Sequence, residues 1–212
     1  MPAERYSPAA PAQLLLRQGR ERAVIAMLRA AGMLPLGARR ILEVGCGSGQ
    51  WLVDFETWGA ARELLAGIDL LPARVAAAAE RLPGADVREG DAVRLPWGDG
   101  GFDIVLQSTV ISSILDPRVR RRVAGEMARV LAPGGVIVWH DMFVGNPRNR
   151  AVRPIRRREL AALFPGFAVR RRRVSLAAPL ARAVAPHSMT AAIALDGLRL
   201  LDTHHLAVLR RP

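Results

Sequence analysis

Residues 41–49 read Ile-Leu-Glu-Val-Gly-Cys-Gly-Ser-Gly, an apolar run that ends in three glycines at alternate positions. This pattern is typical of a buried parallel strand that turns sharply into a helix, because glycine adopts backbone conformations that other residues avoid and allows a ligand to approach closely. Asp69 ends the next apolar run, where an acid can hold ribose hydroxyls. Together the two stretches predict a nucleotide-cofactor site.

The spacing of the glycines separates two kinds of cofactor. A dinucleotide fingerprint has the form G-x-G-x-x-G, in which the third glycine lets the helix pack closely beneath a pyrophosphate. Here the pattern is G-x-G-x-G, and Gln50 stands where the fingerprint needs its last glycine. A cofactor that carries a pyrophosphate therefore fits this loop poorly.

Glu43 before the first glycine, the G-x-G-x-G loop and the later Asp69 resemble motif I of the class I S-adenosylmethionine-dependent methyltransferases. Further matches follow in the family's order at residues 90–92 (Gly-Asp-Ala), 102–107 in a fourth strand and 131–135 at the turn into a fifth. Four independently spaced motifs agree, whereas any one alone would be a weak signal.

The resemblance implies S-adenosylmethionine as cofactor and S-adenosylhomocysteine as product. By the family's pattern Asp69 holds the ribose hydroxyls, Asp91 meets the adenine amino group, and the strand end at Gln107 faces the methyl-donating sulfur. The cofactor-binding residues implied are Glu43, Gly45, Cys46, Gly47, Gly49, Asp69, Leu70, Asp91, Ala92 and Gln107.

The length and the hydrophobic content favour one α/β domain over residues 1–212. We expect a doubly wound, mostly parallel seven-stranded sheet with helices on both faces and one antiparallel strand near an edge. An N-terminal arm and helix (residues 1–37) precede the cofactor-binding core (38–141) and an acceptor-side half (142–212). Helices are expected over residues 12–31, 50–58, 72–81, 116–131 and 156–164, and the last three strands over 136–139, 167–174 and 205–209.

Two segments add to the seven-stranded sheet and its covering helices. The helix at residues 12–31, with Tyr6, is expected to form a lid over the cofactor, and plain packing against the sheet is the alternative. Residues 175–204 stand where the family often has a tight hairpin. Long inserts in compact domains are more often functional than accidental, so we expect a helical flap near the acceptor pocket, with a packing helix as the alternative.

The positive charge is unevenly distributed. All 31 basic residues are arginine; residues 1–106 hold 12 of them against 13 acids, and residues 107–212 hold 19 against 6. This distribution suits an anionic acceptor or peripheral contact with an anionic membrane, and a solvated basic face is the alternative.

Arginine clusters at 156–158 and 170–173 keep an RNA-binding interpretation open, but the chain has a single tyrosine, few aromatic residues for stacking on bases, and no Pro-Pro-aromatic motif after Gln107. Nucleic acid is therefore the less favoured partner.

The remaining composition indicates a cytoplasmic protein. Cys46 is the only cysteine and has no disulfide partner. The N-terminus lacks the pattern of a signal peptide, and no apolar run is long enough to span a bilayer.

His140 is the best placed of four histidines, because it ends a central strand where open α/β sheets bind ligands. A histidine suits the removal of a hydroxyl proton, so His140 is the candidate base and Asp141 the candidate to orient a substrate hydroxyl; a positioning role is the alternative for His140. The loop beyond them is expected to hold the acceptor through Asn146, Arg148, Asn149 and Arg153. No cluster has metal-ligand spacing, so no metal is expected.

The sequence thus predicts a methyltransferase that O-methylates a small-molecule or glycan hydroxyl in natural-product or glycan biosynthesis, with an anionic or lipid-linked acceptor as one form. The alternatives are an RNA-binding methyltransferase and a cofactor-binding accessory protein without turnover.

Overall fold

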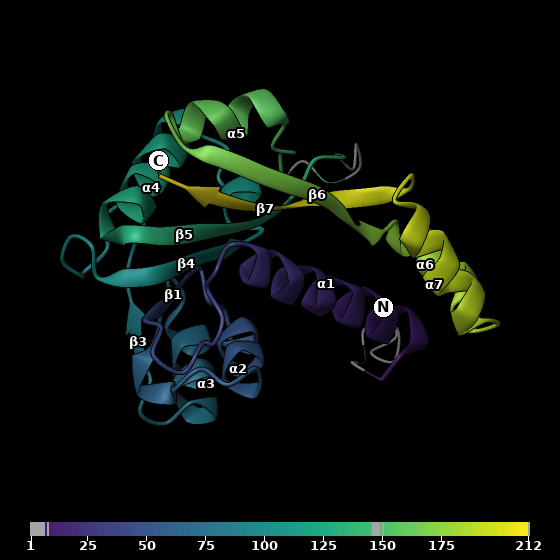
Figure 1. Ribbon diagram of the computed structural model, residues 1–212, viewed down its shortest axis with the longest axis horizontal. Coiled ribbons are helices and arrows are strands. Elements are labelled where there is room, and N and C mark those ends of the chain that lie inside the picture. The colour runs from purple at the N-terminus through teal and green to yellow at the C-terminus, as the bar shows by residue number, and fades with distance from the viewer. Residues whose placement is uncertain (1–6, 8, 146–148, 150, 212) are drawn as a thin grey trace.

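The computed structural model describes residues 7, 9–145, 149 and 151–211, and its strands form a seven-stranded sheet in the order β3-β2-β1-β4-β5-β7-β6 (Figure 1). The strands are β1 Ile41–Val44, β2 Leu65–Asp69, β3 Asp86–Glu89, β4 Phe102–Ser108, β5 Leu131–Met142, β6 Ala168–Leu176 and β7 Asp202–Arg210. Strands β1 to β5 pair in parallel, whereas β7 is antiparallel to both of its neighbours, β5 and β6. The predicted sheet is confirmed.

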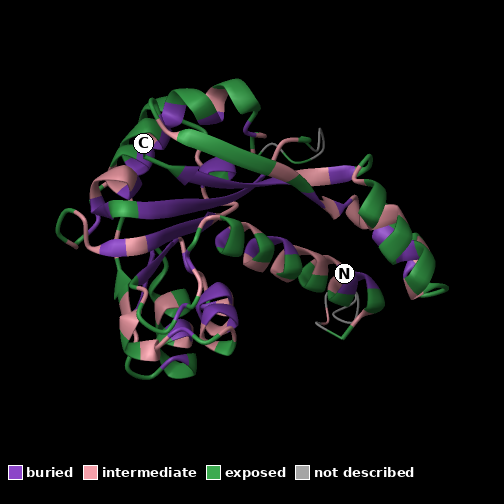
Figure 2. Cartoon of the chain, viewed as in Figure 1, coloured by how far each residue is buried: buried purple, intermediate pink, exposed green. Residues whose placement is uncertain are grey.

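Helices cover both faces of the sheet. On one side lie α1 (Pro11–Ala30), α2 (Gln50–Thr57) and α3 (Pro72–Arg81), and on the other α4 (Pro117–Val130) and α5 (Arg157–Leu163). Successive residues of a strand point to opposite faces, so Ile104 packs in the core beneath α1 and α2 while Val105 packs in the core beneath α4. The central strands are therefore apolar on both sides, and Figure 2 shows most of their length as buried.

Strand β5 differs from the prediction. The sequence predicts a turn over residues 131–135, but β5 already begins at Leu131, which pairs with Phe102, and the regular pairing resumes at Val136 with Ile104. Gly134 has a φ of 74°, and a Cβ on Gly135 would lie 2.8 Å from the carbonyl oxygen of Asp103. The glycines thus make a bulge within the strand instead of ending it.

The insert before the last strand is helical, as predicted. It contains α6 (Ala178–Val184) and α7 (Met189–Leu198), which join the end of β6 to the start of β7. Both pack on α1 around a small core made of Ala12, Leu15, Leu176, Ala181, Ala185 and Ala192. Figure 1 shows this helical pair beside the N-terminal half of α1, at the edge where the parallel strands end.

The helix predicted at residues 12–31 is α1, which packs on the sheet along its C-terminal half. Tyr6 lies outside the described residues, so its predicted part in a lid stays a prediction. None of the helices in the described part of the chain has the length and apolar content that crossing a bilayer requires.

Candidate functional site

The glycine loop adopts the backbone conformations that its sequence predicts. Gly45, Gly47 and Gly49 have φ values of 70°, 54° and 76°, in the left-handed region that favours glycine. A Cβ on Gly45 would lie 2.3 Å from the Val110 side chain, and one on Gly49 would lie 3.2 Å from Ala78 of α3. The alternate glycines therefore serve both the turn and the close packing of the segments around it.

Asp69, at the end of β2, holds this loop. Its carboxylate accepts hydrogen bonds from the backbone N–H groups of Gly47 at 2.9 Å and Leu71 at 3.0 Å. It is buried but lines the cavity described below. Since each carboxylate oxygen carries two acceptor lone pairs, Asp69 retains the capacity to accept from hydroxyl groups.

A cavity of about 630 Å³ opens at the carboxyl ends of the parallel strands, within the range typical of small-molecule sites. Its polar wall includes Asp69, Asp91, Ser108 and Thr109, and its apolar wall includes Ala92 and three residues from the α4 side. Those three are Ile114, Val119 and Val123. Gly45 and Leu70, which the sequence also predicts as cofactor contacts, line it as well.

His140 lies behind this wall, buried at the end of β5. Its Nδ1 is 2.8 Å from the hydroxyl of Ser108, and its ring stacks on that of His204 with centroids 5.0 Å apart. Burial, with smaller contributions from His204 and Arg20, lowers the pKa of His140 well below its usual value. The ring is therefore neutral at physiological pH, and it reaches the cavity through Ser108.

Asp141 points to the other face of the sheet. Its carboxylate accepts from the backbone N–H groups of Ser112 at 3.1 Å and Met142 at 2.9 Å, and burial raises its pKa. Ser112 belongs to the short 3-10 helix η3 (Ile111–Ser113) beside the cavity. Gln107 is fully buried and holds the same segment, since its Oε1 accepts from the Val110 N–H at 3.1 Å. Both side chains thus fix the cavity wall from behind.

A buried charged cluster lies on the α1 side of the loop, and among its members the sequence pointed only to Glu43. Arg20 of α1 stacks over the Trp51 ring at 4.4 Å, and the carboxylates of Glu43 and Asp54 act electrostatically on its guanidinium. Burial raises the pKa of Glu43 well above its usual value, and Asp54 raises it further. In the described residues, Arg20 Nε, Glu43 Oε2, Asp54 Oδ2 and His140 Nε2 are buried without a hydrogen-bond partner.

Of the four predicted acceptor residues, the structure describes Asn149 and Arg153. Asn146 and Arg148 lie outside the described residues. Asn149 is exposed and its side chain accepts from the Ala151 N–H, whereas the backbone N–H of Arg153 donates to the carbonyl of Ser112 at 2.8 Å. Arg153 therefore lies next to the cavity wall. Within the described ranges no group of His, Cys, Asp or Glu has the arrangement that would hold a metal ion.

A family model described as a methyltransferase domain matches residues 41–135, the segment that contains the glycine loop, Asp69 and Asp91. Residues 41–135 thus match a methyltransferase domain, and the fold is that of the class I S-adenosylmethionine-dependent methyltransferases. The cofactor of this family is S-adenosylmethionine, as the sequence predicted.

Two relatives illustrate the range of acceptors among similar methyltransferases. The phthiotriol/phenolphthiotriol dimycocerosates methyltransferase of Mycobacterium tuberculosis is 38% identical over 120 residues, which cover 56% of this chain and 43% of that protein. The 27-O-demethylrifamycin SV methyltransferase of Amycolatopsis mediterranei is 35% identical over 123 residues, which cover 55% of this chain and 43% of that protein. The chain thus matches less than half the length of either relative.

The fold is also that of solved methyltransferases. An S-adenosylmethionine-dependent methyltransferase from Mesorhizobium loti superposes with a TM-score of 0.59 over 88% of this chain and 96% of its own, at 22% sequence identity. At that identity the likeness concerns the fold alone.

The residues around the cavity fit S-adenosylmethionine chemically. Asp69 and Asp91 offer carboxylates at the cavity, and the apolar wall suits a flat adenine ring. The methionine part of S-adenosylmethionine carries an ammonium and a carboxylate group. The buried atoms without partners at Glu43, Asp54 and Arg20 offer the complementary charges.

The sequence pointed to the loop and the acids of this site but not to Arg20 and Ser108. Arg20 reaches the loop only because α1 folds back over Trp51, and a lone arginine in a helix carries no local signal of that contact. Ser108 follows Gln107 directly and shares the strand end with it, so its position at the carboxyl end of β4 was a signal available in the sequence.

Proposed function

We propose that the protein transfers the methyl group of S-adenosylmethionine to a hydroxyl group of a lipid-like or polyketide-like small molecule. The observation that carries this proposal is the cavity that joins the cofactor residues Asp69 and Asp91 to the hydroxyl groups of Ser108 and Thr109. The two relatives support the acceptor class, since one is named for phthiotriol dimycocerosates and the other for the 27-oxygen of a rifamycin. Glycans remain a second form of hydroxyl acceptor.

When bound, the cofactor supplies an electrophilic methyl group, so that the acceptor oxygen must lose its proton during transfer. We assign Ser108 to receive the hydrogen bond of the acceptor hydroxyl, and His140 Nδ1 to accept the proton of Ser108 in turn. The 2.8 Å separation of Ser108 Oγ and Nδ1 supports this relay. The lowered pKa of His140 keeps its ring neutral and able to accept.

We assign positioning roles to the other residues around the cavity. Asp141 and Gln107 hold η3 and the turn after β4 through backbone N–H groups, so they fix the Ser108 side of the wall. We place Arg20 at the carboxylate end of the cofactor, since its guanidinium is buried next to the loop. Arg153, Asn149 and the adjoining loop are proposed to meet the acceptor.

The cofactor assignment is tested by Asp69→Ala. Loss of the carboxylate removes both the ribose contact and the anchor of Gly47, so we expect at least a tenfold weaker affinity for S-adenosylmethionine, roughly 1.4 kcal/mol, in titration calorimetry. Glu80→Ala, an exposed acid on α3, is the control. Equal affinities in the two variants would contradict the assignment.

The hydroxyl acceptor is tested with isotopically labelled methyl groups and a panel of hydroxylated lipids and macrocycles, with mass spectrometry to locate the label. Ser108→Ala should lower kcat by about a hundredfold and leave cofactor affinity unchanged, whereas Ser108→Thr keeps the hydroxyl and should retain activity. Label on nitrogen or carbon, or full activity of Ser108→Ala, would refute the relay.

A further inference from the structure

The surface of the α6–α7 lobe, defined here as residues 178–201, is unusual for a water-facing helical pair. Five of the eleven large apolar side chains exposed in the described residues belong to it: Leu180, Ile193, Leu198, Leu200 and Leu201, which are between 37% and 72% exposed. An exposed apolar patch of this kind on a folded protein marks an interaction surface.

The fully buried side chains of the lobe are small, whereas several of its large apolar side chains face solvent. Ala181, Ala185 and Ala192 are buried against α1, with Val184, Met189 and Leu195 partly buried beside them, while Ile193 and Leu198 are exposed. Amphipathic helices of globular domains normally bury their large apolar side chains. The only charged residue in α7, Asp196, is used internally, since its side chain accepts from the backbone N–H of Leu176.

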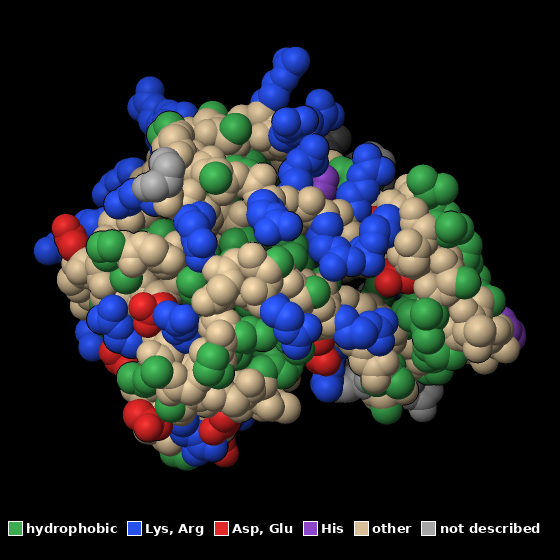
Figure 3. Space-filling model, in the orientation of Figure 1, with side chains coloured by type: hydrophobic (Ala, Val, Ile, Leu, Met, Phe, Trp, Pro, Cys, Tyr) green, Lys and Arg blue, Asp and Glu red, His purple; other side chains and the backbone are tan. Residues whose placement is uncertain are grey.

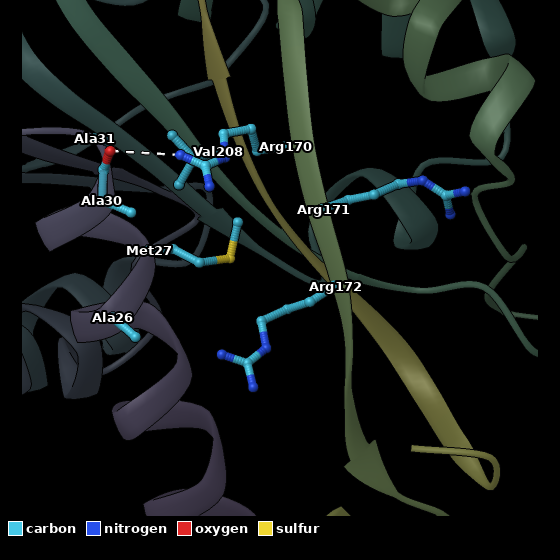
Figure 4. A pocket seen from close by; sticks show the side chains of 8 residues that line it. All are labelled: Ala26, Met27, Ala30, Ala31, Arg170, Arg171, Arg172 and Val208. Atoms are coloured by element: carbon cyan, nitrogen blue, oxygen red, sulfur yellow. Dashed lines mark hydrogen bonds between the residues drawn. The ribbon is translucent and has the colours of Figure 1, made fainter. Parts of the chain in front are cut away.

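Arginine side chains border the lobe. In Figure 3 they run in a band across the face formed by α1 and β6, while the lobe at the right end of the molecule shows many apolar side chains. Arg199 follows α7 and donates to the carbonyl of Arg173. Arg170 and Arg172 of β6 point toward α1, whereas Arg171 points away (Figure 4).

Between α1 and β6 a groove of about 270 Å³ combines both kinds of surface. Its α1 wall consists of Ala26, Met27, Ala30 and Ala31, and its β6 wall carries the side chains of Arg170 and Arg172, with Val208 beneath (Figure 4). An apolar wall beside guanidinium groups matches the chemistry of a lipid, in which a phosphate adjoins hydrocarbon.

We propose that the α6–α7 lobe docks the protein on an anionic lipid bilayer. In this arrangement the outward side chains of Ile193, Leu198 and Leu200 enter the interface, and Arg170 and Arg172 meet lipid phosphates. The lobe leads into β7 at the sheet edge where the cofactor cavity opens, so docking places that edge next to the bilayer. A lipid-like acceptor, as in the proposed function, would then be taken from the membrane surface.

The charge distribution favours a bilayer over a second copy of the chain. Residues 107–212, which include the lobe and β6, hold 19 arginines against 6 acids. Two such surfaces repel each other, whereas an anionic bilayer attracts each arginine near it by about 1 kcal/mol, a factor of about five in binding.

The apolar part of the surface is tested by flotation with phosphatidylcholine vesicles that either contain or lack phosphatidylglycerol. The wild type should float with the anionic vesicles at low salt, and Ile193→Ser/Leu198→Ser/Leu200→Ser should reduce the bound fraction at least about tenfold. Leu115→Ser/Val144→Ser, which alters exposed apolar residues outside the lobe, should bind as the wild type does.

The charged part has a matched control on the opposite face of the sheet. Arg170→Ser/Arg172→Ser should weaken binding to anionic vesicles by about twenty-fold, whereas Arg121→Ser/Arg122→Ser on α4 should change it by less than about threefold. Circular dichroism and the affinity for S-adenosylmethionine establish that each variant is folded. Cofactor affinity tests the proposed function separately, because flotation requires neither acceptor nor turnover.

Three results would overturn the proposal. The wild type stays unbound to anionic vesicles at low salt, or the lobe variants bind as well as the wild type. The third result is the absence of vesicle binding together with a different partner. That partner would be a second copy of the chain, if sedimentation shows a dimer that Ile193→Ser/Leu198→Ser/Leu200→Ser dissociates, or RNA, if filter binding shows a salt-sensitive affinity.

Discussion

Glu43 is buried at the end of β1, immediately before the glycine loop. Burial disfavours the carboxylate, and the nearby Asp54 disfavours it further, whereas Arg20 acts in the opposite direction. The result is a pKa well above the usual value, so Glu43 holds a proton over a pH range in which an exposed glutamate is ionised. An ammonium group placed beside it would reverse this preference.

We therefore predict that cofactor binding releases a proton from Glu43. The ammonium group of S-adenosylmethionine favours the carboxylate and lowers its pKa, so affinity should rise with pH up to the pKa of Glu43 in the free protein. Calorimetry in buffers of different ionisation enthalpy measures the released proton. Glu43→Gln should abolish the release and weaken affinity about tenfold; the exposed Glu63→Gln serves as control, and an unchanged proton count in Glu43→Gln would contradict the prediction.

Helix α4 shows why charge patterns are hard to interpret before the helix is placed. Arg118, Arg120, Arg121 and Arg122 look alike in the sequence, yet Arg120 is fully buried while the other three are exposed. The guanidinium of Arg120 donates to the carbonyl of Ile114 and to the carboxylate of Glu159 on α5. It therefore joins the cavity wall to the neighbouring helix.

We predict that Arg120→Ala lowers the free energy of unfolding by about 3 kcal/mol, because it removes a fully buried guanidinium and leaves its two partly buried acceptors without that donor. Arg121→Ala, one position further along and exposed, should change it by less than about 0.5 kcal/mol. Urea denaturation followed by circular dichroism measures both. Equal midpoints for the two variants would show that the buried contact is unimportant for stability.

Most helices and strands could be predicted from the sequence because local signals define them. Asp116 caps α4 by accepting from the Arg118 N–H at 2.7 Å, and a proline follows in the first turn; both residue types are common at helix starts. The start of β5 could not be predicted, because Pro133 and Gly134 carry the signal of a turn and only pairing with β4 extends the strand past them.

The candidate site likewise has residues that could be placed from the sequence and contacts that could not. Asp69 and Asp91 could be placed because their spacing from the glycine loop follows the order of the strands. The contact of Arg20 with Trp51 and the pairing of Ser108 with His140 join segments 31 and 32 residues apart. Contacts of this kind depend on how helices and strands pack, which local sequence does not determine.

At the scale of the whole molecule, three neutral histidines gather near the carboxyl edge of the sheet. Burial lowers the pKa of His204 and of His205 to about 4, with nearby arginines adding to the effect, and it also lowers the pKa of His140 well below its usual value. An unfolded histidine takes up its proton near pH 6.5. Unfolding at acidic pH therefore binds protons that the folded protein excludes.

We predict that the free energy of unfolding falls steadily as the pH is lowered from about 6.5 to 4. Denaturation with urea at a series of pH values measures the slope, and His204→Asn, which removes one of the titrating groups, should make it shallower. His187→Asn, an exposed histidine, is the matched control and should leave the slope unchanged. A free energy that is constant over this range would contradict the assignment of neutral buried histidines.

The order of the strands also bears on how the chain folds during synthesis. β7 follows β5 and β6 in the chain, yet it lies between them in the sheet and supplies the strand partner of β6. Until residues 202–210 have left the ribosome, β5 presents an open edge and the arginine-rich β6 has no place in the sheet. Folding of the second half must therefore await the synthesis of β7, and a nascent chain stalled before β7 would expose an edge that other unfinished chains can join.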